Sequence, residues 1–298
     1  MILMSKRILA AACAAATALA LSACSPSAST GGKTSKDGTL TVMASFYPLK
    51  YLAEKVGGEH VTVTSLTPDG AEPHDLELSP KMVDSLASAD AVVYLAGFQG
   101  AVDEAVEQHA PKTVIDVSPA AQLVAIDSTS NHPGEDEDTD EAQSGEAQSG
   151  EAADHDHEGH EHEGHDHEHA DHDHHHDMSM DPHFWLDPAR MANAATLVGD
   201  KLAEADPTNA ETYKANAQAL NEELTSLGDN LVAKTSTCQI KTFVTAHTAF
   251  GYLADRTGLT QVGISGLDPE SSPSPARLAE IGKIVKNQGV TTIFTEAL

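Results

Sequence analysis

Short apolar runs alternate with helical patterns over most of the chain. Runs rich in β-branched residues predict strands at residues 39–43, 61–66, 91–95, 113–117, 242–245, 261–264 and 291–294. Helical patterns lie between them, at residues 47–56, 80–88, 101–108, 249–257 and 275–286. The run Ala91–Leu95 (AVVYL) is almost continuously apolar, as in a parallel sheet that helices cover on both faces. The alternation therefore predicts an α/β fold.

A long amphipathic pattern separates the two α/β regions. Asp187-Pro188 and Asp206-Pro207 each combine an N-cap residue with a following proline, which predicts helix starts at both places. In the second helix the apolar stripe consists of Tyr213, Ala217, Leu220, Leu224, Leu227 and Leu231. A helix that continues to Lys234 is about 40 Å long and can join two lobes. We expect an N-terminal lobe at residues 39–127, continued by 181–205, then a linker helix at 206–235 and a C-terminal lobe at 236–298.

The N-terminus has the layout of an export signal. Lys6 and Arg7 precede an apolar run, and residues 21–24 (LSAC) resemble the lipobox of bacterial lipoproteins. We expect a signal peptide at residues 1–23, lipidation of Cys24, and a flexible tether at 24–38, with a signal for soluble secretion as the alternative. After cleavage Cys24 and Cys238 would remain, which is too few for a disulfide framework or a thiolate zinc site. Cys238 is expected to be buried, or to pair with a cysteine outside this sequence.

The segment 128–180 is acidic, rich in histidine and too polar to fold. It contains 18 acidic residues and no lysine or arginine, within a chain whose formal net charge is −29. Eleven of the 17 histidines lie between residues 155 and 176: His155, His157, His160, His162, His165, His167, His169, His172, His174, His175 and His176. Imidazoles interleaved with carboxylates predict a disordered loop that collects zinc, copper or nickel weakly; the alternative is a solvated acidic linker. The acidic balance argues against nucleic-acid binding.

Three histidines outside that segment occupy positions typical of ligand sites. His74 lies in a loop after the strand at 61–66, and His247 lies where the strand at 242–245 ends and a helix begins. His183 lies between the acidic segment and the helix that starts at Asp187-Pro188. Open α/β sheets place their ligands at the carboxyl ends of strands. Three imidazoles with a fourth position filled by another group would suit tetrahedral zinc.

The motifs around these histidines resemble those of a known family. EPHDLELSP, DPHFWLDP and AHTAFGYLADRTGL are similar to motifs in the metal-binding receptor lipoproteins of bacterial ABC importers for zinc and manganese, and the likeness runs from about Thr39 to Leu298. The resemblance implies two α/β lobes joined by a long rigid helix, with metal bound in the cleft by His74, His183 and His247. A histidine in the third position favours zinc over manganese. Glu72 is an open candidate ligand, and the family's fourth ligand would lie beyond Leu298.

These observations predict a receptor rather than an enzyme. It would be a monomer, lipid-anchored on the extracytoplasmic face of the cell membrane, that captures zinc and delivers it to an ABC permease and its ATPase. A manganese receptor of the same family is the alternative. A zinc hydrolase would need a general base such as Glu72, Asp75 or Glu296, but the sequence has no HExxH helix and no GxSxG elbow. A surface adhesin is neither favoured nor excluded by the residues.

Asp75, Trp185 and Glu296 lie in the motifs or near the C-terminus, and each has an expected role. Asp75 is expected either to accept the second ring N–H of His74 or to cap the following turn. Trp185 is expected to anchor the packing beside His183, and Glu296 to be structural. Because three strands would leave a C-terminal lobe with an exposed edge, we expect the chain to be a fragment or cut at its C-terminus.

Overall fold

The computed structural model describes residues 38–109, 111–126 and 180–295. The predicted signal peptide, Cys24, the eleven histidines of the acidic segment and Glu296 lie outside these described residues. Among the described residues no helix is both long enough and apolar enough to cross a membrane. Every strand of the two sheets described below runs parallel to its neighbours, as the apolar runs predict.

The first sheet has four strands in the order β2-β1-β3-β4. The strands are β1 (Leu40–Ala44), β2 (Val61–Ser65), β3 (Ala91–Tyr94) and β4 (Thr113–Asp116). The helices packed around it are α1 (Tyr47–Gly57), α2 (Pro80–Ser88), α3 (Gly100–His109), α4 (Ser118–Ala121) and α5 (Pro188–Ala205). Short 3-10 turns lie at Gly58–His60 and Phe184–Leu186. Ser79 accepts a hydrogen bond from the first turn of α2, and Asp187 accepts one from the first turn of α5, the latter as predicted.

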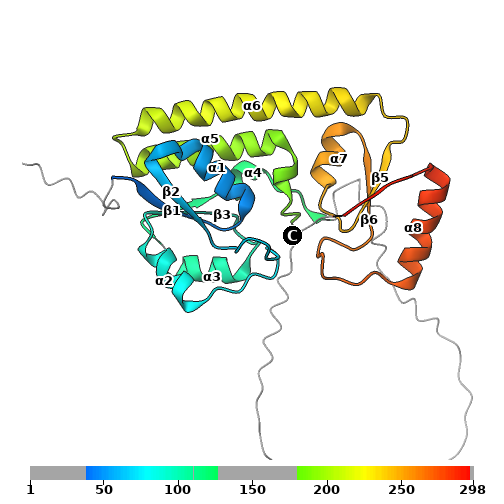
Figure 1. Ribbon diagram of the computed structural model, residues 1–298, viewed down its shortest axis with the longest axis horizontal. Helices are drawn as coiled ribbons and strands as arrows, with labels where there is room; N and C mark the ends of the chain where they lie inside the picture. Colours follow the sequence, from blue (N-terminus) through cyan, green and yellow to red (C-terminus); the bar gives the residue numbers. More distant parts are fainter. Residues whose placement is uncertain (1–37, 110, 127–179, 296–298) are drawn as a thin grey trace, which may run out of the picture. The chain divides into compact units, whose positions relative to one another are not determined.

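Alternate side chains of these strands enter two separate cores. Val42 and Val93 pack in the core that includes residues of α1 and α5, whereas Met43 and Val92 pack against α2 and α3. Figure 1 shows α1 and α5 on one side of the sheet and α2 and α3 on the other. A sheet buried on both faces explains why AVVYL shows no alternation of apolar and polar residues.

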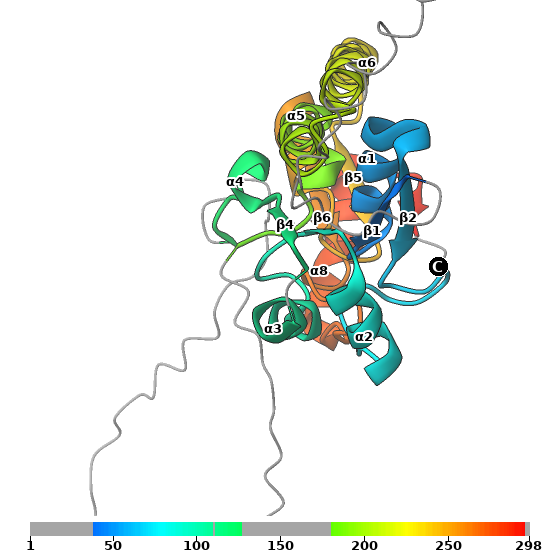
Figure 2. The same cartoon turned by 90° about the vertical axis from the view of Figure 1, so that its left-hand side faces the viewer.

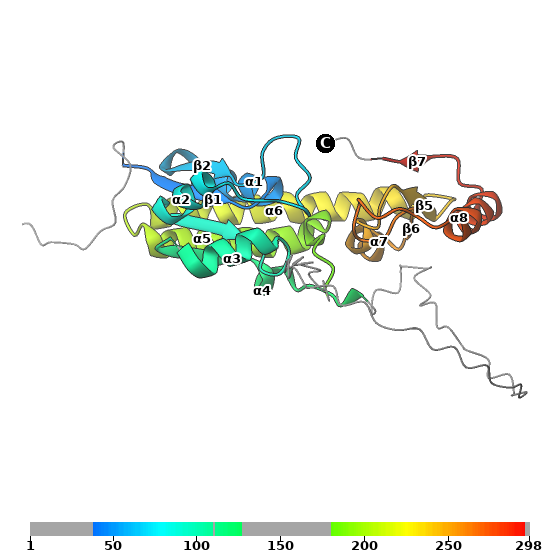
Figure 3. The ribbon, with the colours of Figure 1, turned by 90° about the horizontal axis from the view of Figure 1, so that it is seen from below.

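The second sheet has three strands in the order β6-β5-β7. It contains β5 (Thr242–Thr245), β6 (Thr260–Gly263) and β7 (Ile293–Phe294), with α7 (Gly251–Thr257) and α8 (Pro275–Gln288). Figure 3 shows α7, α8 and these strands at one end of α6. The predicted strand at 291–294 is shorter in the structure, because only Ile293 and Phe294 pair with β5.

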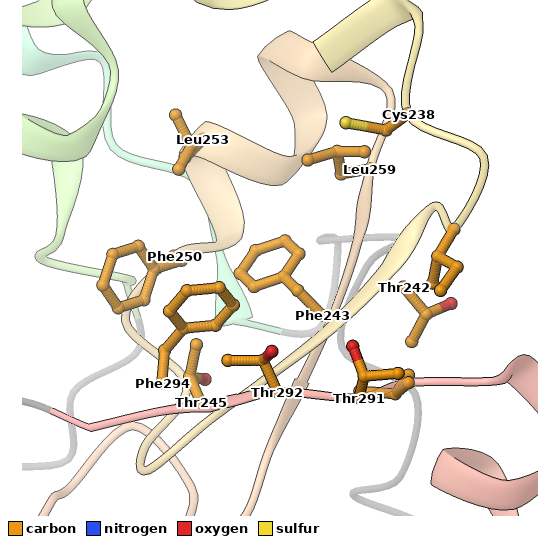
Figure 4. A pocket seen from close by; sticks show the side chains of 12 residues that line it. Cys238, Thr242, Phe243, Thr245, Phe250, Leu253, Leu259, Thr291, Thr292 and Phe294 are labelled. Atoms are coloured by element: carbon orange, nitrogen blue, oxygen red, sulfur yellow. The ribbon is translucent and has the colours of Figure 1, made fainter.

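The two faces of this sheet differ. On one face Val244 and Val262 pack against Ile281 of α8. The other face borders a pocket of about 450 Å³, into which Phe243, Phe250 and Phe294 project (Figure 4). Cys238 at the rim of this pocket is exposed, so the expectation that it is buried is wrong.

Helix α6 (Ala210–Ser236) has 27 residues, about 40 Å at 1.5 Å per residue. It contacts α1 and α5 beside the first sheet and α7 beside the second (Figure 1). Figure 2 shows α6 directly beside α5. The chain therefore passes from one sheet to the other along a single helix, as the sequence predicts.

The predicted start and apolar stripe of this helix need correction. Asp206 does not cap α6; its N–H bonds to Leu202 at the end of α5, and its carboxylate accepts hydrogen bonds from Asn209 and Tyr213. These contacts close a turn, and α6 begins three residues later than expected. The stripe is buried only as far as Leu224, and Leu227 is 48% exposed.

Candidate metal centre

The structure brings the three predicted histidines together. One ring nitrogen of each of His74, His183 and His247 lies within 4.8 Å of the others. The Nε2 atoms of His74 and His183 are 3.2 Å apart, and the ring of His247 lies 5.4 Å from that of His183 between centroids. His183 and His247 are 1% and 9% exposed. Three segments far apart in the sequence thus form one buried cluster of imidazoles.

Glu72 holds the ring of His74. Its Oε1 atom lies 2.5 Å from Nδ1 of His74 and accepts a hydrogen bond from the backbone N–H of the same residue at 3.1 Å. Of the two alternatives for Asp75, the hydrogen bond to this ring nitrogen is not formed, because Glu72 occupies that place and Asp75 is exposed. Gln99, which is buried, donates hydrogen bonds to Thr67 and to the carbonyl of Pro73 and so fixes the loop.

Asp181 holds His183 in the same manner. Its Oδ1 atom lies 2.8 Å from Nδ1 of His183 and accepts from the backbone N–H of His183 at 2.9 Å. Glu72-Pro73-His74 and Asp181-Pro182-His183 therefore share one pattern, acid-Pro-His, in which the carboxylate binds the histidine two residues later.

These contacts fix the state of both rings. An ionised carboxylate can only accept hydrogen bonds, so Nδ1 of each imidazole carries the proton and Nε2 presents its lone pair. The Nε2 atoms of His74 and His183 lie 3.2 Å apart, so in two neutral rings of this tautomer the lone pairs face each other. Two nitrogens bound to one tetrahedral zinc at 2.0–2.1 Å would be about 3.4 Å apart. The pair is spaced to share a cation.

The surroundings of His183 also favour its neutral form. Burial lowers the pKa of His183; the nearby Asp181 carboxylate opposes this shift, while His74 and His247 add to it. A neutral imidazole is the form that binds a metal, so His183 is ready to act as a ligand near neutral pH.

His247 follows β5, the central strand of the second sheet. Its carbonyl accepts hydrogen bonds from Thr245 at 2.6 Å and from Gln261 at 3.1 Å. Gln261 is 1% exposed and reaches across from the neighbouring strand β6. The backbone of His247 is thereby held at the carboxyl end of the sheet, the edge where open α/β sheets place ligands.

Aromatic side chains close the cluster on the side of the first sheet. The ring of Trp185 lies 5.1 Å from His183 and 5.0 Å from Phe46, and Phe98 lies 5.0 Å from His74, between centroids. Trp185 thus anchors the packing beside His183, as expected. Apolar walls lower the local dielectric and strengthen the interaction of a cation with its ligands.

Sequence reasoning missed several residues that hold the histidines, namely Asp181, Gln99 and Gln261. The repeated acid-Pro-His pattern was the available signal for Asp181. Gln99 and Gln261 have no comparable signal, because their roles depend on which loop and strand pack beside them.

The chain is similar to a known family and to several named proteins. The family model described as ZnuA, "Zinc-uptake complex component A periplasmic", matches residues 42–298. The zinc-binding lipoprotein AdcA of Streptococcus pneumoniae R6 is 34% identical over 263 residues, covering 87% of this chain and 46% of that protein. The high-affinity zinc uptake system protein ZnuA of Bacillus subtilis 168 is 30% identical, covering 95% and 79%. The chain therefore spans about half the length of the streptococcal relative.

Solved structures show the same fold. The crystal structure of Streptococcus pneumoniae AdcAII has a TM-score of 0.65 and 29% identity, covering 87% of this chain and 80% of that one. Zn(II)-bound AdcA from the same species has a TM-score of 0.61 and 29% identity, covering 87% and 46%. The range matched by the family model, residues 42–298, covers nearly all of the described residues and includes the positions of the three clustered histidines. The chain therefore belongs to the ZnuA family, whose model is described as a component of a zinc-uptake complex.

Proposed function

We propose that this chain is an extracytoplasmic receptor that binds zinc through His74, His183 and His247 and delivers it to a membrane ABC permease. The observation that carries the proposal is the 3.2 Å distance between the Nε2 atoms of His74 and His183, with a ring nitrogen of His247 within 4.8 Å of both. In neutral rings of this tautomer the two lone pairs repel unless a proton or a metal cation lies between them. A site built only of neutral nitrogen donors suits zinc better than manganese, which prefers oxygen ligands.

Its relatives support zinc as the cargo. AdcA and the Bacillus ZnuA are named for zinc binding and zinc uptake, and related structures of AdcA are described as Zn(II)-bound. A fourth ligand would complete the shell; Glu72 is a poor choice because its carboxylate already faces Nδ1 of His74, away from Nε2. Glu72 is instead proposed to orient the ring.

The remaining parts of the proposal concern placement and partners. A lipid on Cys24 would hold the folded part close to the membrane, and the permease with its ATPase would receive the metal there. We also propose that the protein is a monomer. Its domains would span residues 39–127 with 181–205, then 206–235, and 236–298. The histidines of segment 128–180 would collect zinc weakly before it reaches the central site.

Isothermal titration tests the ligand set. The protein with residues 131–177 deleted should bind one zinc ion tightly and manganese much more weakly. Replacing His74, His183 or His247 by alanine should each weaken zinc binding by more than the roughly tenfold to hundredfold that loss of an outer hydrogen-bond partner costs. His109→Ala is the matched control, because His109 is the exposed last residue of α3 and is not part of the cluster.

Tight zinc binding that survives replacement of all three histidines would contradict the proposal. Equal affinity for manganese would instead favour the manganese receptor.

A further inference from the structure

Tyr252 on α7 connects the segments that carry two of the three histidines. Its hydroxyl donates a hydrogen bond to the carbonyl of Asp181 at 2.7 Å and accepts one from the backbone N–H of Val124 at 2.9 Å. Tyr252 itself is 2% exposed and belongs to the large core cluster of the first sheet, although α7 packs beside the second.

The position of this hydroxyl relates directly to the imidazoles. Asp181 binds Nδ1 of His183, and the same residue is held through its carbonyl by Tyr252. Tyr252 lies five residues after His247, at the start of the helix that follows that histidine. The hydroxyl is therefore a short link between the backbone near His183 and the backbone near His247.

Neighbouring side chains hold the ring of Tyr252 in place. The guanidinium of Arg190 lies over the ring at 4.5 Å and donates to the carbonyl of Ala121 at 2.7 Å. One turn further along α7, Arg256 pairs with Asp187 at 3.2 Å. Tyr252 and Arg256, on successive turns of α7, thus both bind the segment that begins at Asp181 and continues into α5.

The tyrosine remains a donor throughout the physiological range. Burial raises the pKa of Tyr252 to about 12; the hydrogen bond from Val124 opposes this rise, and the charge of Asp181 adds to it. The hydroxyl keeps its proton and can hold the Asp181 carbonyl at any pH at which the receptor works.

We propose that Tyr252 is a positioning residue of the metal site, which sets the spacing between His183 and His247 by clamping the Asp181 segment to α7. The proposal rests on the zinc site proposed above and deepens it. The hydrogen bonds of the Tyr252 hydroxyl go to backbone groups of Asp181 and Val124. Although neither hydrogen bond reaches an imidazole, we expect removal of the Tyr252 hydroxyl oxygen to weaken metal binding.

The test compares two buried tyrosines. Tyr252→Phe removes the hydroxyl and keeps the ring. Tyr213→Phe is the matched control, because Tyr213 is also fully buried and donates to the carboxylate of Asp206 at 2.9 Å, in the α5–α6 turn. Zinc binding and thermal unfolding of the apo protein are measured for both variants and the parent, all with residues 131–177 deleted.

We expect Tyr252→Phe to weaken zinc binding about tenfold, the lower end of the range for outer hydrogen-bond partners of metal ligands. Tyr213→Phe should leave the affinity unchanged, even if both variants lower the midpoint of thermal unfolding. The visible absorption of the Co²⁺-loaded protein should change only in Tyr252→Phe, because this spectrum reports the geometry of the ligands. In a His183→Ala background, Tyr252→Phe should cause no further loss of zinc affinity, since the Tyr252 hydroxyl is proposed to act by positioning His183.

Zinc affinity within twofold of the parent would overturn the proposal. So would a full tenfold loss in the His183→Ala background, or failure of Tyr252→Phe to fold when Tyr213→Phe folds, since both would indicate a general structural role. Absence of tight zinc binding in the parent protein would instead refute the proposed function itself.

Discussion

At the residue scale, the acid-Pro-His pattern links the sequence to the chemistry most closely. In both copies the carboxylate binds the backbone N–H and Nδ1 of the following histidine. The histidines could be chosen from the sequence, since they follow strands or precede a helix and lie in motifs that resemble a known family. Their positions in space could not, because these depend on contacts that form only after folding. Gln99 binds the carbonyl of Pro73 next to His74, and Gln261 binds the carbonyl of His247.

Glu72 provides a prediction that separates a ligand from an orienting residue. If Glu72 only accepts the Nδ1 hydrogen bond of His74, Glu72→Gln keeps an acceptor oxygen and should weaken zinc binding less than about threefold. Glu72→Ala removes the acceptor and should cost about tenfold to hundredfold. Titration of both variants checks this, and equal large losses would show that the carboxylate itself binds the metal.

His183 predicts how the stability of the metal-free protein depends on pH. Its pKa is lowered in the folded state, chiefly by burial, whereas an unfolded chain has an ordinary value near 6.5. Below about pH 6.5 the unfolded chain therefore binds a proton that the folded chain does not, and stability falls as the pH falls. Between pH 7.5 and 5.5 the loss from this residue is up to about 1.4 kcal/mol.

Urea unfolding of the apo protein at several pH values measures this loss. His183→Asn should flatten the pH dependence, whereas His109→Asn, which changes an exposed residue, should not. An identical slope in the parent and in His183→Asn would disprove the assignment.

At the element scale, the sequence predicts the strands and most helices, because periodicity and proline-containing caps are local signals. The sequence-based prediction is wrong where tertiary contacts determine the start of a helix or the burial of its side chains. Asp206-Pro207 resembles the true cap at Asp187-Pro188, yet the Asp206 carboxylate closes a turn with Asn209 and Tyr213. Burial raises the pKa of Asp206, but these hydrogen bonds outweigh it and lower the pKa overall. At Leu227 the stripe leaves the core, and α6 instead contacts α7 where Arg256 lies against Gly228.

Because α5 packs closely on α6, replacing a glycine by alanine at this contact is expected to lower the free energy of unfolding rather than raise it. Replacing a helical glycine by alanine normally stabilises a helix by about 0.8–1 kcal/mol. At Gly199 a Cβ atom would lie 2.5 Å from Cβ of Ala217, so the two helices would have to separate. Gly199→Ala should therefore destabilise the protein by about 1–3 kcal/mol.

Gly282→Ala in α8 is the control, because a Cβ atom there meets nothing within 4 Å. It should raise the free energy of unfolding, and chemical denaturation measures both changes. A stabilising Gly199→Ala would mean that α5 and α6 pack less closely than described.

At the scale of the whole molecule, the two-sheet arrangement and the joining helix agree with the sequence-based prediction and with solved relatives. The acidic segment joins this fold close to the site. Ala125 and Met180 form an antiparallel bridge, and Met180 directly precedes Asp181. The ends of the segment are thus held together within the described fold, whatever the length of chain between them.

Deletion of residues 131–177 should therefore leave the fold intact. It removes 18 acidic residues and no lysine or arginine, which leaves a formal net charge of −11. We expect the number of bound zinc ions to fall to one, the tight site to keep its affinity within about threefold, and the midpoint of thermal unfolding of the apo protein to change little. Titration and calorimetry of the two forms check this, and loss of the tight site would contradict the separation of the two functions.

The central claim is that His74, His183 and His247 bind one cation together. Anomalous diffraction at the zinc edge, from crystals of the zinc-loaded protein without residues 131–177, tests it most directly. We expect one strong peak within about 2.0–2.1 Å of a ring nitrogen of each histidine, with Nε2 as the donor in His74 and His183. A peak elsewhere, or a zinc ion that lacks any one of the three imidazoles, would contradict it.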